Sequence, residues 1–254
     1  MRVVSITGIG GGVGTTTVAA QLAATLAARI KNVIALDFSS QNMLRLHFGM
    51  HWQDSTGLVP QVLANRPWNE AAYRCENGVH FLPFGRCSEQ DIVNFYRQLE
   101  HDPAWLSSRL GELDADDDTC VLIDCPRAEH ALSSQAYTLS DMILMVAEAD
   151  THSYVALAES RTWLAANHAE KTTYLLNGFD PTLAMDRDIA QLIRADHGSS
   201  LCPITIHRDE AVREALASKI CLDAYAPYSQ ASADFASLTT WLVARLAHLP
   251  PLGL

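Results

Sequence analysis

Short runs of apolar residues recur along the chain, and most are closed by a residue that ends regular structure, such as proline, glycine, aspartate or asparagine. Runs of this kind, rich in valine, isoleucine and leucine, are typical of strands that are buried on both faces of a parallel sheet. The predicted strands are Val3–Thr7, Asn32–Asp37, Val79–Gly85, Cys120–Pro126, Asp141–Val146, Thr173–Leu176 and Leu201–Ile206.

Stretches with helical periodicity lie between these runs. Val18, Leu22, Leu26 and Ile30 recur at every fourth position after the first strand, which places them on one face of a helix. The other predicted helices are Glu89–Leu99, Ala104–Leu113, Tyr154–Ala166 and Phe235–Ala247, and Gly57–Tyr73 is a helical or irregular connection. Strands that alternate with helices pair in parallel through right-handed crossovers. We therefore expect an α/β fold with a mostly parallel central sheet and helices on both faces.

The length and composition indicate one globular unit. A chain of 254 residues suits a single α/β domain over residues 1–254, and hydrophobic residues make up 48% of it. The chain begins directly with a strand and has no run near the ~18 apolar residues of a membrane span, so we expect a cytoplasmic protein. Its formal charge of −11 disfavours binding to the nucleic-acid backbone or directly to anionic lipid.

A glycine-rich loop separates the first strand from the first helix. Five glycines stand among the seven residues Gly8–Gly14, and Thr15, Thr16 and Thr17 open the helix. Because glycine adopts positive φ without a Cβ penalty, the loop can aim successive N–H groups at an anion, and the helix N-terminus adds the positive end of its dipole. Strand, loop and helix in this order predict a phosphate site of the P-loop NTPase type. The alternative is a glycine-rich turn that holds no ligand.

The loop lacks the lysine of the usual phosphate-binding loop. Written against G-x-x-x-x-G-K-[ST], Gly14 takes the second glycine and Thr16 the Mg²⁺-binding hydroxyl, whereas Ile9 replaces the first glycine and Thr15 the lysine. The hydroxyl that a metal needs is therefore present, and the cation that would contact the phosphates is absent.

Two carboxylates that end predicted strands are candidate metal ligands. Asp37 closes Asn32–Asp37, and Asp124 lies near the end of Cys120–Pro126. Ligands of open α/β sheets bind at the carboxyl edge of the strands, where we expect both side chains to lie. Each carboxylate can order the water around Mg²⁺ or cap the helix that follows. The pairing with Thr16 favours the metal role for Asp124.

The run Gly10–Thr17, GGGVGTTT, resembles the deviant Walker A loop K-G-G-V-G-K-T-T of the MinD/ParA ATPases. Gly10 stands where that family has its signature lysine, and Thr15 stands where it has the phosphate-loop lysine. The G-G-V-G-T-T-T form, together with Leu82–Gly85 and Ile206–Ala211, further resembles the BcsQ family, the MinD-like proteins of bacterial cellulose secretion.

The resemblance implies that the chain binds ATP and Mg²⁺, with Thr16, Asp37 and Asp124 on the metal side. Asn177 matches the asparagine that reads the adenine edge, although an asparagine before Gly178 also suits a turn. The positions carried over as nucleotide-binding are Gly10, Gly11, Gly12, Val13, Gly14, Thr15, Thr16, Thr17, Asn177, Ile206, His207 and Arg208.

The departures from the family pattern imply weak catalysis. Ser39 stands where the family has the aspartate that orients the attacking water, and a serine neither carries charge nor accepts a proton at neutral pH. Since both lysines are missing as well, we assign no catalytic residue and expect at most slow ATP hydrolysis. Arg45, Arg127 and Arg208 are candidates to replace the lost positive charge.

By the same resemblance, the chain would form a nucleotide-stabilised homodimer that regulates or scaffolds cellulose biosynthesis, with the cellulose synthase complex and small accessory Bcs proteins as partners. Relatives in the MinD branch end in a basic amphipathic membrane helix, whereas Phe235–Ala247 has Arg245 as its only basic residue. We therefore expect a core-covering helix, and recruitment to the inner membrane through partners. The alternatives are an active switch ATPase that positions DNA or a division complex, and a scaffold without nucleotide.

Overall fold

The computed structural model describes residues 1–113, 115–126 and 131–248, and for residues 160–167 it describes the backbone alone. An eight-stranded sheet runs through the centre in the spatial order β3-β4-β2-β5-β1-β6-β7-β8. Its strands are β1 (Arg2–Gly8), β2 (Asn32–Asp37), β3 (Tyr73–Arg74), β4 (His80–Leu82), β5 (Thr119–Asp124), β6 (Met142–Ala147), β7 (Thr172–Phe179) and β8 (Leu201–His207).

Neighbouring strands of the sheet are parallel, with one exception at its edge. β3 pairs antiparallel with β4, where Tyr73 and Arg74 lie opposite Phe81 and His80. The other six pairings are parallel, which confirms the predicted mostly parallel sheet. β3 has no counterpart among the predicted strands because two residues are too few to show an alternating pattern.

The helices follow the strands in the predicted alternation, and the four predicted helices after the first one are all present within a few residues of their expected bounds. The α-helices are α1 (Thr15–Ala27), α2 (Leu44–His47), α3 (Leu58–Leu63), α4 (Glu89–Glu100), α5 (Trp105–Gly111), α6 (Ala131–Leu139), α7 (Thr151–Asn167), α8 (Ala184–His197), α9 (Glu210–Ser218), α10 (Leu222–Tyr225) and α11 (Gln230–Ala247). Short 3₁₀ turns lie at Trp68–Ala71, Ala169–Lys171 and Gly198–Ser200.

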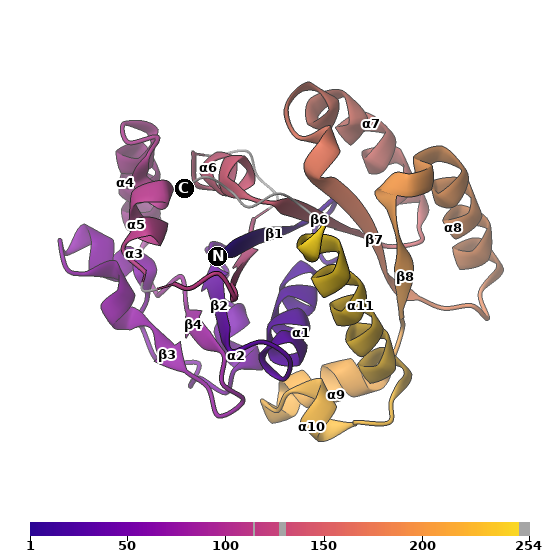
Figure 1. The fold of residues 1–254 in the computed structure, drawn as a ribbon, viewed down its shortest axis with the longest axis horizontal. Helices are drawn as coiled ribbons and strands as arrows, with labels where there is room; N and C mark the ends of the chain where they lie inside the picture. Colours follow the sequence, from indigo (N-terminus) through magenta and orange to yellow (C-terminus); the bar gives the residue numbers. More distant parts are fainter. Residues whose placement is uncertain (114, 127–130, 249–254) are drawn as a thin grey trace.

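Helices cover both faces of the sheet, as predicted. Figure 1 shows α1 and α11 on one side of the strands and α4, α5 and α6 on the other. Successive strand residues point to opposite faces, so that Val4 and Ile6 pack with α1 while Val3 packs with the helices of the other side. The result is an open parallel sheet whose carboxyl edge is left for ligands.

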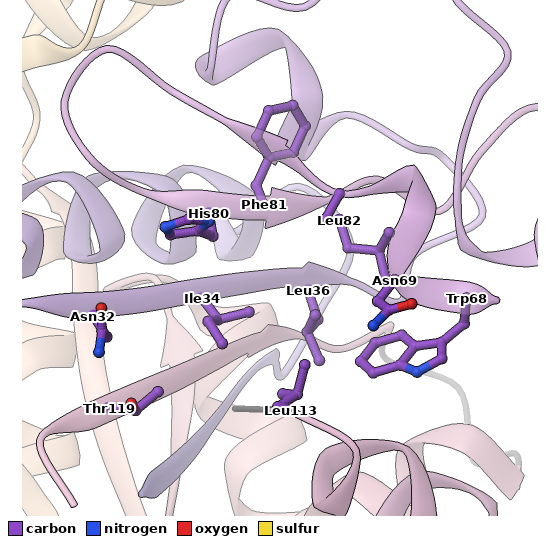
Figure 2. Close-up of a pocket in the computed structure, with 11 residues that line it drawn as sticks. Asn32, Ile34, Leu36, Trp68, Asn69, His80, Phe81, Leu82, Leu113 and Thr119 are labelled. Carbon is purple, nitrogen blue, oxygen red and sulfur yellow. The ribbon is translucent and has the colours of Figure 1, made fainter. Parts of the chain in front are cut away.

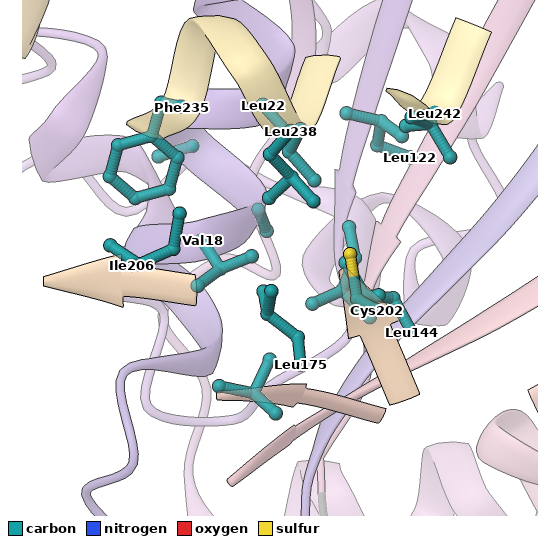
Figure 3. Close-up of a cluster of buried hydrophobic side chains, with 14 of the residues drawn as sticks. Val18, Leu22, Leu122, Leu144, Leu175, Cys202, Ile206, Phe235, Leu238 and Leu242 are labelled. Carbon is teal, nitrogen blue, oxygen red and sulfur yellow. The ribbon is translucent and has the colours of Figure 1, made fainter. Parts of the chain in front are cut away.

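The helix α11 packs against the core. Its residues Phe235, Leu238 and Leu242 are buried in the same cluster as Val18 and Leu22 of α1, and Figure 3 shows Leu238 next to Leu22. Hydroxyl contacts also join the two helices, since Thr25 and Thr239 lie 2.5 Å apart through their Oγ1 atoms. The prediction that Phe235–Ala247 is a core-covering helix is confirmed. Among the described residues, no helix combines the length and the apolar character needed to cross a bilayer.

Candidate nucleotide-binding site

The glycine-rich loop opens at the carboxyl edge of the central strand. β1 lies between β5 and β6, and it ends at Gly8 before α1 begins at Thr15. The loop takes left-handed backbone conformations at Gly12, with φ of 83°, and at Gly14, with φ of 84°. A Cβ at Gly11 or Gly12 would meet no atom within 4 Å, so this side of the loop faces open space. The backbone therefore forms a cradle that an anion can fill.

Asn177 holds the loop in place. Its side-chain amide donates a 2.8 Å hydrogen bond to the carbonyl of Val13. The same amide nitrogen lies so close to Gly14 that a Cβ at this position would overlap it. Gly14 is thus required both by its positive φ and by the approach of Asn177. The amide keeps one further donor hydrogen and its carbonyl oxygen, and the adenine contact stays a prediction.

Thr16 and Asp124 meet at the base of the loop, as the sequence predicts. The Thr16 hydroxyl donates a 2.7 Å hydrogen bond to Oδ2 of Asp124, which ends β5. Asp124 is buried, and burial raises the pKa of its carboxyl to about 7. The hydrogen bond from Thr16 lowers this pKa and so opposes part of the effect of burial. A divalent cation beside this pair would favour the charged carboxylate and could take the hydroxyl as a ligand.

Asp37 lies next to Asp124 across the β2–β5 pair, where the two residues are in register. Its carboxylate is buried and accepts hydrogen bonds from the backbone N–H groups of Ser39, at 2.9 Å, and Leu44, at 3.2 Å. Burial and the nearby charge of Asp124 raise the pKa of Asp37 well above its ordinary value. Asp37 therefore holds the segment after β2 in place through these two hydrogen bonds. A cation bound beside Asp124 would also favour the charged form of the Asp37 carboxylate.

A cavity of about 430 Å³ joins the loop to this metal side. It is lined by Gly8, Gly10, Gly11, Gly12, Gly14, Thr15, Thr16, Thr17, Ser39, Ser40, Gln41, Met43, His47, Asp124, Cys125, Pro126 and Leu216. Among the residues that the structure describes, this lining holds no lysine and no arginine. His47 supplies no positive charge at neutral pH either, because burial lowers the pKa of its imidazole to about 4.

The arginines proposed to replace the missing lysines are engaged elsewhere or lie outside the described part of the chain. Arg45 is buried and donates to the carbonyls of Asn42 and Asp54. Arg208 is exposed, and its charge acts on the carboxylates of Glu148 and Asp180. Arg127 lies outside the described residues. The described lining of the cavity therefore offers an anion backbone N–H groups and hydroxyls rather than arginine side chains.

The predicted base-lining segment lies at the end of β8, with β6 and β7 between it and the loop strand. The side chain of Ile206 is buried against α1 and α11 (Figure 3). His207 has a partner that the sequence does not reveal: Asp234 of α11 accepts from the His207 backbone N–H and lies 2.8 Å from its Nδ1. Asp234 is far from His207 in the chain and follows no motif, so only the packing of α11 on β8 identifies it.

A second cavity, of about 240 Å³, opens near the amino ends of β2 and β5 (Figure 2). Asn32 and Thr119, the first residues of those strands, lie at one side, and Trp68 lies at the other. The lining between them is mostly apolar, with Ile34, Leu36 and Leu82 among its residues. None of the described residues that line this cavity belongs to the glycine-rich loop.

The comparisons with known proteins agree with this geometry. A model of the family described as "Cellulose biosynthesis protein BcsQ" matches residues 1–243. This chain belongs to the BcsQ family. The BcsQ protein of Escherichia coli K12 is 30% identical over 257 residues, which cover 100% of this chain and 99% of that protein. The chain is thus a member of a cellulose biosynthesis family.

The fold is that of the MinD/ParA-type ATPases. The septum site-determining protein MinD of Pyrococcus horikoshii, solved with Mg-ADP, superposes with a TM-score of 0.76 at 23% identity and 97% coverage of both chains. Cobyrinic acid a,c-diamide synthase of Mycobacterium smegmatis, solved with an ATP analogue and magnesium, gives a TM-score of 0.74 at 18% identity and 99% coverage of both chains. At these identities the likeness establishes the MinD-like P-loop fold of this BcsQ family member.

Proposed function

We propose that this chain binds Mg²⁺-ATP at Gly10–Thr17 and acts as a nucleotide-stabilised dimeric regulator or scaffold in bacterial cellulose biosynthesis and secretion. The observation that carries the proposal is the 2.7 Å bond between the Thr16 hydroxyl and Asp124 at the base of a glycine cradle. A glycine-rich turn without a ligand has no need of a buried carboxylate at this place. Both solved proteins described above contain adenine nucleotide and magnesium.

Binding without lysine is physically reasonable. The loss of one charge-assisted hydrogen bond costs roughly 1.5–3 kcal/mol. The backbone N–H groups of the cradle would still donate to the phosphates, and a divalent cation would offset their charge. Thr16 and Asp124 would hold the Mg²⁺, with Asp37 in support, and the cation would offset the negative charge of the phosphates. Asn177 and the segment Ile206–Arg208 would receive the base. Residues 1–254 would form one nucleotide-binding domain.

Hydrolysis should suffer more than binding, because the missing charges matter most where negative charge develops in the transition state. Ser39 lines the cavity at the place expected for a water-orienting carboxylate, and its hydroxyl cannot act as a base at neutral pH. We therefore propose slow turnover, with nucleotide joining two copies of the chain. The cellulose synthase complex and small accessory Bcs proteins would be the partners, and contact with the inner membrane would be made through them.

The first experiment measures nucleotide binding by calorimetry on purified protein, with Mg²⁺-ATP, Mg²⁺-ADP, and ATP in excess EDTA. We expect binding that depends on Mg²⁺ and that Thr16→Ala weakens about tenfold, since the metal loses a ligand. Thr138→Ala, an exposed threonine of α6, is the matched control and should bind as the wild type does. If the wild type retains no adenine nucleotide at millimolar concentration, the chain is a scaffold without nucleotide.

The second experiment separates a regulator from an active switch ATPase. Light scattering coupled to gel filtration should give the mass of a dimer with Mg²⁺-ATP and of a monomer without nucleotide. Turnover of Mg²⁺-ATP on the same sample should be far below the ~1 s⁻¹ of slow kinases. A faster rate, together with salt-dependent retention on DNA, would favour the switch ATPase instead.

A further inference from the structure

A histidine stands against the phosphate loop at the place where the loop has lost a cation. A Cβ at Gly10 would lie 3.0 Å from Cε1 and 3.2 Å from Nδ1 of His152, so the imidazole fills the space where a side chain of residue 10 would begin. Gly10 itself is buried and lines the cavity of the loop. The ring therefore covers the loop edge-on, with its Nδ1–Cε1 edge toward the backbone.

The turn between β6 and α7 fixes the position of this histidine. β6 pairs directly with β1, so α7 begins beside the loop at the carboxyl edge. The backbone N–H of Ser153 donates to the carboxylate of Asp150 at 2.6 Å, and the Ser153 hydroxyl accepts from the N–H of Glu148 at 3.1 Å. Ser153 is fully buried, whereas the neighbouring His152 is exposed. The turn is thus anchored on one side of His152 while its imidazole stays accessible.

We infer that His152 is a phosphate-contacting residue, which replaces the cation missing at Gly10 by donating to the terminal phosphate of the bound nucleotide. The inference rests on the proposed binding of Mg²⁺-ATP. No hydrogen bond occupies either imidazole nitrogen among the residues that the structure describes. The arginines near the site are committed to carbonyls or face carboxylates, and His47 is neutral, so none of these described residues offers a free cation beside Gly10.

The chemistry of imidazole suits this role. A neutral histidine donates one N–H and a protonated one donates two, and a phosphate next to the ring favours the protonated form. The histidine side chain is shorter than a lysine side chain. It extends from the neighbouring turn between β6 and α7 rather than from the loop itself. Because glycine has no side chain, Gly10 leaves room for the imidazole of His152.

The test compares ATP with ADP, because only ATP carries the third phosphate. Calorimetry with Mg²⁺-ATP and Mg²⁺-ADP is run on the wild type and on His152→Gln, which keeps a polar side chain but removes the imidazole. We expect His152→Gln to bind ATP about tenfold more weakly while its affinity for ADP changes less than about twofold. His101→Gln, an exposed histidine at the end of α4, is the matched control and should leave both affinities unchanged.

A rescue experiment separates a phosphate contact from a structural role. His152→Lys should keep most of the preference for ATP, since an ammonium replaces the imidazole. The double variant Gly10→Lys with His152→Ala should restore the preference that His152→Ala alone loses, because removal of the ring frees the space for a Cβ at residue 10. The thermal midpoint without nucleotide should stay the same in His152→Gln and in the wild type.

Each other outcome has a definite meaning. Equal affinities of His152→Gln and the wild type for ATP would overturn the inference and leave the proposed function standing. An equal loss for ATP and ADP would show that His152 only shapes the loop, which also overturns it. If the wild type binds neither nucleotide, the proposed function fails, and the role of His152 fails with it.

Discussion

The two halves of the candidate site are built differently. On the metal side, Asp37 ends β2, Asp124 ends β5 and Thr16 lies in α1, the helix after β1. The strands β2, β5 and β1 are adjacent in the sheet, and both carboxyl groups are buried with hydrogen-bond partners. On the phosphate side, the loop from Gly10 to Thr15 offers backbone and hydroxyl groups, and Gly11 and Gly12 are exposed. One half is a buried cluster with two carboxyl groups, and the other is an open cradle without a lysine.

The two halves of the site affect nucleotide binding and catalysis differently. Buried carboxylates are costly without a compensating cation, so their presence favours a retained metal site. Lysines that reach the phosphates matter more for the transition state than for the bound ground state. A site that keeps the first and lacks the second fits a nucleotide that is held rather than turned over.

Removal of the metal-side charge should give the largest effect. Asp124→Asn keeps the shape of the side chain but loses its charge, so the Mg²⁺-dependent affinity for ATP should fall about a hundredfold. Calorimetry with and without Mg²⁺ measures this change. Asp118→Asn, an exposed aspartate in the turn before β5, is the control and should behave as the wild type does. An unchanged affinity in Asp124→Asn would place the metal elsewhere.

The buried carboxylates should also make the stability of the nucleotide-free protein depend on pH. Asp124 keeps its proton in the folded state up to about pH 7, whereas its ordinary pKa is 3.8. Folding therefore takes up a proton between these values, and the free energy of unfolding should fall by roughly 2 kcal/mol from pH 5 to pH 7 through this group. Asp37, with its raised pKa, acts in the same direction.

Urea unfolding in EDTA at several pH values, with wild type and Asp124→Asn in parallel, measures this dependence. His47 acts in the opposite direction, because its lowered pKa costs stability as the pH falls below 6.5. The difference between the two proteins cancels the contribution of His47. A difference that stays constant from pH 5 to pH 7 would mean that Asp124 is ionised throughout.

The smallest expected effect comes from restoring a cation on the phosphate side. Thr15 lines the cavity at the place of the phosphate-loop lysine, so Thr15→Lys should tighten the binding of both ATP and ADP about tenfold. Thr17→Lys, which adds the same charge two residues further along α1, is the control and should give a smaller gain. If both variants bind alike, net charge rather than position determines the affinity.

The strands and helices follow from the sequence because their patterns are local. Apolar runs such as Met142–Ala147 are buried throughout, and Val18 and Leu22 lie on the buried face of α1. The edge strand β3 escapes prediction because its two residues depend on the neighbouring β4 for their conformation. The spatial order of the strands is likewise a property of the assembled sheet.

The site divides in the same way. Strand, glycine-rich loop and helix, with Thr16 at the start of that helix, are adjacent in the chain and predict the cradle directly. Asp124 is predicted because a carboxylate at the end of a buried strand must lie at the carboxyl edge. The bond from Asn177 to Val13, the pairing of His207 with Asp234 and the contact of His152 with Gly10 join segments far apart in the chain and carry no motif.

The amino-acid sequence by itself determined the fold class and the glycine-rich loop between β1 and α1, and it predicted Thr16, Asp37 and Asp124 as metal-side residues, because each depends on local periodicity, on glycine conformation or on the end of one strand. The tertiary structure alone decided which distant side chains complete the site. Placing β6 beside β1, and β7 next to β6, brings His152 and Asn177 to the loop, and packing α11 on β8 brings Asp234 to His207. Such contacts depend on strand order and helix packing, which no single stretch of sequence encodes.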